Sequence, residues 1–195
     1  MGRPLESVPM PGSTARRALL RFLCLLALLP AAAFARDTLA EYTLDPVHTR
    51  VMFAISHAGF SNALGTVSGS TGTVVFDPDD WTRARVDVRV PIARADLGDA
   101  DWNKATLAKS LLDAEGHPEA RFVSTRVEPV DATHAKVHGD LSLRGVTRAV
   151  VLDVTLNAAK RHPMPPFRRT VGFSATTTLR RADFGITAWP NVIGA

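Results

Sequence analysis

The sequence contains one cysteine, Cys24, among 195 residues. A single thiol excludes a disulfide framework and any zinc or iron–sulfur site built from several thiolates. Common catalytic motifs are also missing, because the sequence has no G-x-S-x-G, no phosphate-binding P-loop, no G-x-G-x-x-G and no H-E-x-x-H. These absences favour a protein that is not an enzyme.

A long apolar run occurs once, from residue 19 to residue 34, and basic residues precede it. Small residues flank Phe34, so we predict a cleaved export signal over residues 1–35, with cleavage after Ala35 and a periplasmic location. The apolar core after Arg21 has about 14 residues, whereas a membrane-spanning helix needs roughly 20. A membrane-anchored form is the alternative if cleavage fails. Arg16-Arg17 is interpreted as an ordinary basic start rather than a twin-arginine signal.

Most of the excess positive charge belongs to this export signal. The whole chain has a net charge of +4 and a pI of about 9.8. Four arginines and one glutamate lie in the signal, so residues 36–195 have a net charge of only +1. The basic pI therefore reflects targeting and does not indicate nucleic acid as a partner. The 160 residues after the signal suffice for one domain with its own core.

Alternation of apolar and polar residues is the main structural signal after residue 40, and it is typical of β-strands. The clearest case is RVDVRV at residues 85–90, which places three valines on one face and charges on the other. The same pattern predicts strands over residues 49–58, 74–76, 120–128, 135–143, 146–156 and 170–179.

Turns and one helical segment complete the pattern. Glycines at 65, 69 and 72 indicate bulges or tight bends, and Arg144-Gly145 indicates a hairpin. Residues 99–115 lack glycine and proline, and they predict one or two short helices. The chain is thus expected to be all-β, with seven or eight antiparallel strands in a sandwich or a barrel. Periodicity alone does not separate a filled barrel from a hollow one.

Three segments carry a family resemblance, in order and spacing: YTLDPVHTRVMFAISHAGF from residue 42, GDLSLRGVTR from residue 139 and LRRADFGI from residue 179. They resemble the YceI-like family of bacterial exported proteins, over nearly all of residues 36–195. The resemblance implies a lipocalin-like antiparallel β-barrel whose apolar cavity binds an isoprenoid chain, such as a polyprenyl lipid or a quinone tail. It implies no catalytic activity and no covalent cofactor, but a non-covalent isoprenoid lipid or ubiquinone-like ligand.

The sequence departs from the family pattern at two places. Leu111-Leu112 stands where the family usually has two aromatic residues, so the cavity mouth is expected to be reshaped. The family also continues past the segment that matches Trp189 to Gly194 with one more strand. We therefore expect the final family strand to be absent from the barrel, which leaves an edge open to another strand.

The candidate ligand-binding residues are the inward-facing positions of the predicted strands, together with one histidine and one arginine. Each apolar member could instead be ordinary filled core. They are Phe53, Ile55, His57, Val74, Phe76, Val88, Val90, Phe122, Leu141, Leu143, Leu152, Phe173 and Arg181.

Polar candidates favour structural roles over chemistry. His48 and His57 are nine residues apart, which is roughly 30 Å along one strand and too far for a shared metal ion. We expect structural or cavity-lining hydrogen bonds from these histidines, with head-group contact as the alternative and no metal site. Arg181 is expected to close a barrel end, with ligand head-group binding as its alternative.

The preferred hypothesis is a periplasmic carrier that holds an isoprenoid or similar amphiphile in a barrel. Its expected partners are this lipid and, transiently, the inner membrane, in a monomer or homodimer. One alternative is a histidine-dependent enzyme acting on a quinone or lipid head group, which requires His48, His57 and Arg181 to converge. The other is an interaction module that uses the open strand edge.

Overall fold

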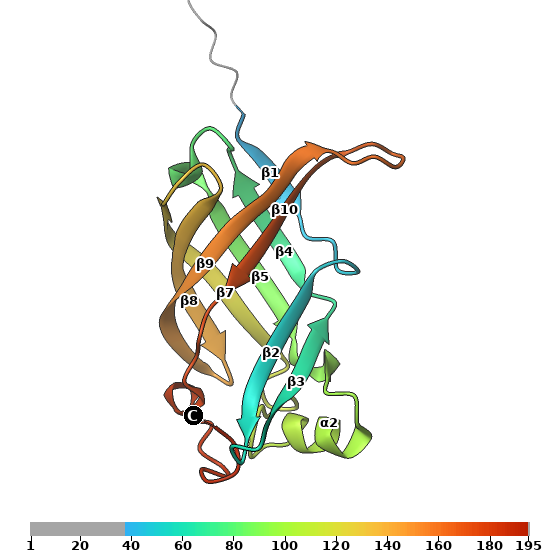
Figure 1. The fold of residues 1–195 in the computed structure, drawn as a ribbon, viewed down its shortest axis with the longest axis vertical. Coiled ribbons are helices and arrows are strands. Elements are labelled where there is room, and N and C mark those ends of the chain that lie inside the picture. The colour runs from blue at the N-terminus through green and yellow to red at the C-terminus, as the bar shows by residue number, and fades with distance from the viewer. Residues whose placement is uncertain (1–37, 195) are drawn as a thin grey trace, which may run out of the picture. The chain divides into compact units, whose positions relative to one another are not determined.

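The computed structural model describes residues 38–194. The predicted export signal, residues 1–35, lies outside this range. Thr38–Ala195 forms a compact unit of its own that contains all the strands described (Figure 1). Within the described range, none of the helices is both long and apolar enough to cross a bilayer.

Strands dominate this unit, which confirms the all-β prediction. They are accompanied by one α-helix, α2 (Ala100–Leu107), and three short 3-10 helices, η2 (Trp81–Arg83), η3 (Ile92–Arg94) and η4 (Arg181–Phe184). The strands are β1 (Ala40–Thr43), β2 (Arg50–His57), β3 (Ser61–Ser68), β4 (Thr71–Phe76), β5 (Arg85–Pro91), β6 (Ala95–Asp96), β7 (Glu119–Pro129), β8 (His134–Leu143), β9 (Val146–Arg161) and β10 (Arg169–Thr176).

Two antiparallel sheets form the barrel wall. The larger sheet has the order β1-β4-β5-β7-β8-β9-β10, and the smaller has the order β2-β3-β6. Because β1, β4 and β5 are joined in the chain to β2, β3 and β6, the smaller sheet continues three strands of the larger one. At the β3–β4 bend Gly69 has a φ of +78°, a conformation that favours glycine. The wall thus consists of seven long, bent strands, within the number expected.

The predicted boundaries differ from the observed ones in a few places. β1 and β3 were not predicted as strands, because β1 is short and β3 is interrupted by Gly65 and small polar residues. Only one α-helix forms in the segment 99–115. Asp99 caps it by accepting hydrogen bonds from the N–H groups of Asp101 and Trp102. The predicted strand 170–179 ends earlier, at Thr176.

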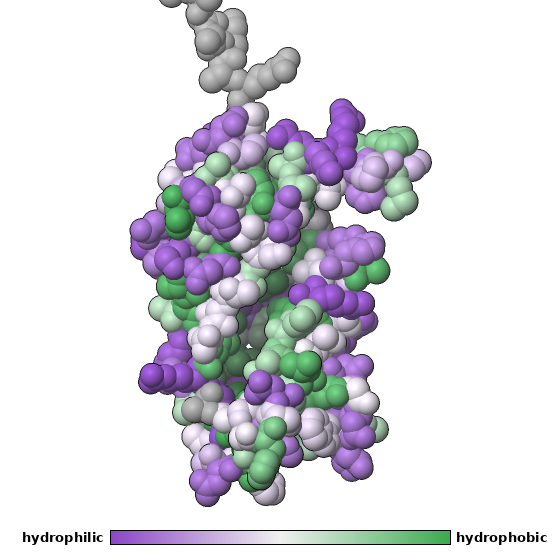
Figure 2. Space-filling model, viewed as in Figure 1, coloured by the Kyte–Doolittle hydropathy of each residue, from purple (hydrophilic) through white to green (hydrophobic). Residues whose placement is uncertain are grey.

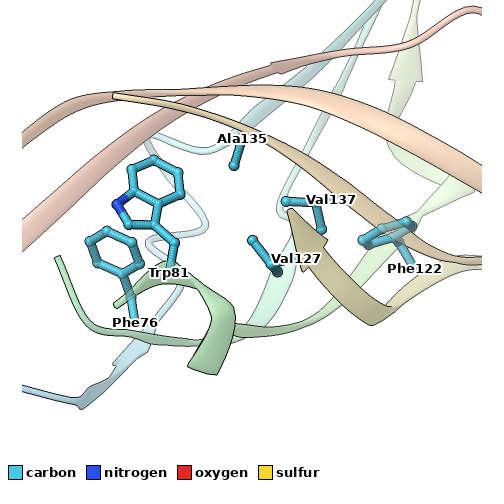
Figure 3. Packing of buried hydrophobic residues seen from close by; sticks show 6 residues of the cluster. All are labelled: Phe76, Trp81, Phe122, Val127, Ala135 and Val137. Carbon is cyan, nitrogen blue, oxygen red and sulfur yellow. The ribbon is translucent and has the colours of Figure 1, made fainter. Parts of the chain in front are cut away.

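An aromatic cluster fills one end of the barrel, which we call the core end. Phe76 meets Trp81 and Phe173 edge to face, with ring centroids 5.0 Å apart in both pairs. Val127, Ala135 and Val137 extend this buried group. In Figure 3, Phe122 lies at the far end of the cluster from Phe76 and Trp81. The core is therefore concentrated on one side of Phe122.

We predict that Phe76→Ala lowers the free energy of unfolding by about 3–5 kcal/mol, because it leaves a cavity beneath two aromatic rings. Urea unfolding followed by circular dichroism measures the change. The matched control is Phe60→Ala, whose side chain is 93% exposed and should change stability by less than about 0.5 kcal/mol. Equal losses in the two variants would contradict this placement of the core.

Acid should weaken the turn between β7 and β8. The Asp131 carboxylate accepts hydrogen bonds from the N–H groups of Thr133 and His134 and from the His134 ring. These bonds, that from the Thr133 N–H first, lower the pKa of Asp131 to about 2. Because the folded-state pKa lies below the unfolded value, this stabilisation is present above about pH 4 and is lost as the pH falls towards 2. Asp131→Asn should flatten the fall in melting temperature over that window, whereas Asp140→Asn on β8 should not.

Candidate functional site

A row of apolar side chains crosses the inner face of the larger sheet. Val88 on β5 lies opposite Phe122 on β7, and Phe122 lies opposite Leu141 on β8. The Phe122 ring covers Gly139, where an added Cβ would stand only 2.4 Å from the ring. The ring therefore lies flat against the wall.

The smaller sheet presents a matching inner face. Phe53 on β2 lies opposite Gly65 on β3, and Ile55 lies opposite Ala63. The Phe53 ring covers Gly65, where an added Cβ would stand 2.2 Å from the ring. Ala63 is buried, and Phe53 and Ile55 are half-buried. This side of the barrel is thus also lined by hydrocarbon.

The predicted wall residues fall into two groups. Phe76 and Phe122 are buried in the core cluster, and Val74, Leu141, Leu152 and Phe173 pack against it. The second group is half-buried and lies outside the cluster. It consists of Phe53, Ile55, Val88, Val90 and Leu143, and we call the space that these five residues line the apolar chamber. Their partial exposure indicates apolar wall that the chain's own side chains do not cover.

The chamber opens to the side. β2 is paired along its whole length only with β3, and β10 is paired only with β9. In Figure 1, β10 ends at about the level where β2 begins, and we call the gap between these two strands the seam. Figure 2 shows the surface hollowed at this place, with hydrophobic residues at its depth. No strand of residues 38–194 fills the seam.

The last described residues only begin to pair with β2. The N–H of Gly194 donates to the carbonyl of Ser56, and Ile193 forms an isolated bridge with His57. The rest of that β2 edge, from Arg50 to Ile55, has no neighbouring strand in the described range. This unpaired edge forms one rim of the seam.

Two surface hollows formed by residues 38–194 lie outside the wall. The larger, of about 490 Å³, is lined by outward-facing Arg89 and Glu119 and by Arg94. The smaller, of about 250 Å³, lies over the outer face of β4 and β5. Both hollows lie on the outer face of the sheet and would leave a hydrocarbon ligand exposed to water, so we place the candidate site in the chamber instead.

Loops close the end of the barrel opposite the core end, which we call the helix end. Phe184 and Ile186 are buried there, with 2% and 6% of their surface exposed. The Arg144 guanidinium donates to the carbonyls of Gly185 and Lys109, which ties η4 to the segment after α2. Phe184 therefore acts as an apolar plug at the helix end of the barrel.

Arg181 holds the last turn of the chain in place. Its guanidinium donates to four backbone carbonyls, those of Gly194, Ile186, Ala188 and Ile193, at 2.6–2.9 Å. These contacts provide the end-closing role that we preferred for this residue. Head-group binding by Arg181 stays a prediction. In this structure the guanidinium N–H groups donate to backbone carbonyls instead.

The histidine candidates do not come together. His48 lies in the loop before β2, where its ring forms a hydrogen bond with Asp45 at 2.8 Å. His57 ends β2, and its ring lies tilted beside that of Trp102, with ring centroids 5.4 Å apart. The length of β2 separates them. No group of three His, Cys, Asp or Glu suited to a metal ion occurs within residues 38–194. The convergence that the enzyme hypothesis requires is therefore missing.

Sequence reasoning missed Trp81 and Trp102, because each lies outside a predicted strand. Trp81 follows the turn Asp77–Asp80, and a lone tryptophan after a turn signal was the only clue to its burial. Trp102 lies on α2 and is 43% exposed beside His57, at the helix end of the chamber. Leu111-Leu112, the altered pair, is half-buried in the turns after α2.

The bent antiparallel barrel places this protein among the lipocalin-like barrel folds, and the comparisons identify its family. Residues 42–195 match the YceI-like domain. "UPF0312 protein" of Pseudomonas savastanoi pv. phaseolicola is 37% identical over 149 residues, covering 75% of this chain and 77% of that protein. A similarly named protein of Pseudomonas fluorescens is 36% identical over 153 residues, covering 75% and 76%. This chain belongs to the YceI-like family.

Solved structures support the same fold. The Campylobacter jejuni YceI protein superposes with a TM-score of 0.60 at 27% identity, covering 75% of this chain and 84% of that one. Burkholderia cenocepacia BcnA superposes with a TM-score of 0.65 at 22% identity, covering 74% and 88%. At that lower identity the likeness shows the fold alone.

We predict that Arg181→Gln frees the final turn, because a glutamine side chain cannot reach four carbonyls. Hydrogen exchange of the Gly194 amide, which donates to Ser56, should become at least about 10-fold faster. The exposed neighbour Arg180 provides the matched control, Arg180→Gln, which should leave that amide protected. Similar exchange in both variants would show that the guanidinium does not hold the turn.

Proposed function

We propose that this protein is an exported carrier that holds the isoprenoid chain of a polyprenyl lipid or a quinone in the apolar chamber. One observation carries the proposal: the five residues of the chamber are inward-facing, apolar and only half-buried. A filled barrel would cover them with side chains. A long hydrocarbon ligand would cover them instead.

The driving force fits this class of ligand. Burying a few hundred Å² of hydrocarbon yields several kcal/mol at about 25 cal/mol per Å², before the costs of immobilising the ligand. An isoprenoid tail needs few directional contacts, and the chamber residues offer none through their side chains. The wall therefore suits a tail better than a polar metabolite.

The seam supplies a route for the ligand. A long chain could reach the chamber sideways between β2 and β10 without being threaded through a closed end. The head group would then remain near His57 and Trp102 at the helix end, where both side chains are exposed. In this proposal the protein sequesters its ligand and performs no chemistry on it, since His48 and His57 lie at opposite ends of β2.

Extraction tests the proposal directly. We expect the protein, expressed with its export signal in a bacterium and purified after processing, to release a long-chain isoprenoid into organic solvent, identified by mass spectrometry. Purified protein should also retain added octaprenyl quinone through gel filtration. Repeated recovery of no long-chain lipid, together with no retention of the quinone, would overturn the carrier function.

Filling the chamber should abolish retention. Val90→Trp and Leu143→Trp place bulk in the chamber, and each should lower the retained quinone by about 10-fold or more. Val123→Trp on β7 is the matched control, because Val123 is 36% exposed on the outer face and should retain wild-type binding. Circular dichroism verifies folding in all three variants. A similar loss in the control would argue against binding in the chamber.

A further inference from the structure

The hairpin between β9 and β10 projects from the barrel wall. Arg161 and Arg169 form its last strand pair, and the N–H of His162 donates to the carbonyl of Arg168. Figure 1 shows the hairpin extending past its neighbours, at the end of the unit away from α2. Its tip consists of residues 162–168, which neither close the barrel nor line the chamber.

Four cations surround this tip without a compensating anion. Lys160 and Arg161 precede the tip, Arg168 is its last residue, and Arg169 follows it. From residue 154 to residue 182 the sequence has six lysines and arginines and no aspartate or glutamate. None of the four hairpin cations forms an ion pair within residues 38–194, although most exposed arginines on the larger sheet's outer face do. The hairpin is thus a local positive patch on a domain that is nearly neutral.

Two large apolar side chains lie between these cations. Met164 is 62% exposed and Phe167 is 50% exposed, and both belong to the tip. Three prolines, Pro163, Pro165 and Pro166, restrict the backbone around them. A single exposed apolar residue is ordinary on a protein surface. This tip differs from that ordinary case, because it holds a methionine and a phenylalanine on a stiff, projecting loop between four cations. Such an arrangement suits a surface that is charged outside and apolar beneath.

We propose that this hairpin docks the protein on a bilayer that contains anionic phospholipids. Lys160, Arg161, Arg168 and Arg169 would contact the lipid phosphates, and Met164 and Phe167 would enter the boundary between head groups and acyl chains. An acidic polymer such as nucleic acid would use the cations but would gain nothing from the methionine. Docking is independent of the proposed cargo, because none of these residues lines the apolar chamber.

Vesicle co-sedimentation tests the docking. The chain from Arg36 onward is used, because the apolar run of the export signal would itself bind lipid and because Thr38–Ala195 is a compact unit with the whole core. Phosphatidylcholine vesicles with about one third phosphatidylglycerol should bind it more tightly than phosphatidylcholine alone, and added salt should weaken that binding.

Paired variants separate the two parts of the interaction. Lys160→Glu/Arg161→Glu should weaken binding to the anionic vesicles at least about 10-fold. The matched control is Lys104→Glu/Lys109→Glu, which makes the same charge change near α2 and should bind as before. Met164→Ser/Phe167→Ser keeps the charge and should also weaken binding by about 10-fold or more.

A tryptophan at the tip reports insertion. Phe167→Trp should add fluorescence that brominated phospholipids quench, whereas Phe60→Trp, at the exposed turn after β2, should not. The proposal is wrong if both charge-reversal pairs bind equally. It is also wrong if Met164→Ser/Phe167→Ser binds like wild type while a single-stranded oligonucleotide displaces the protein from the vesicles, since that result indicates an acidic polymer as the partner.

Discussion

The register of the antiparallel ladders is the constraint on which the rest of this structure depends. Cross-strand pairing places Val88, Phe122 and Leu141 in one row, and the same alternation turns Arg89 and Arg121 outward. A shift of one residue in any of these strands would exchange the two sets. The apolar chamber and the ion pairs of the outer face both follow from this single choice of register.

The densely packed core and the apolar chamber occupy different parts of the same wall. The aromatic cluster of Phe76, Trp81 and Phe173 concentrates burial at the core end, where the sheet is continuous. The chamber lies beyond Phe122, where side chains are half-buried and one strand edge is unpaired. In that part, arginine side chains hold the loops in place, because Arg144 and Arg181 donate hydrogen bonds to backbone carbonyls that no strand pairs with. Contacts at the two ends of the barrel thus hold together a wall whose middle is less densely packed.

The sequence predicted the parts of this fold in which local pattern and final environment agree. Strict alternation in residues 85–90 determined a strand and its inner face before any tertiary contact was known. The sequence indicated only a bulge or bend at Gly65 in β3. It did not reveal the Phe53 ring that covers this glycine, because Phe53 lies on another strand and only the fold brings the two together. Likewise, Arg181 has a long side chain, and its four backbone acceptors lie in loops whose conformation no hydrophobic periodicity predicts. The spacing of His48 and His57 along one strand was enough to predict that they lie far apart. The contact of His57 with Trp102 was not predictable, because it depends on how α2 packs.

The glycines under the aromatic rings have a consequence for the size of the chamber. The rings of Phe53 and Phe122 lie where a Cβ at residue 65 or 139 would stand, so each ring is recessed into the wall by the thickness of a missing side chain. A β-carbon at either position would push its ring towards the barrel axis. The inner diameter therefore depends on the absence of a side chain at Gly65 and Gly139. A relative with alanine at either position would have a narrower barrel interior around the same backbone.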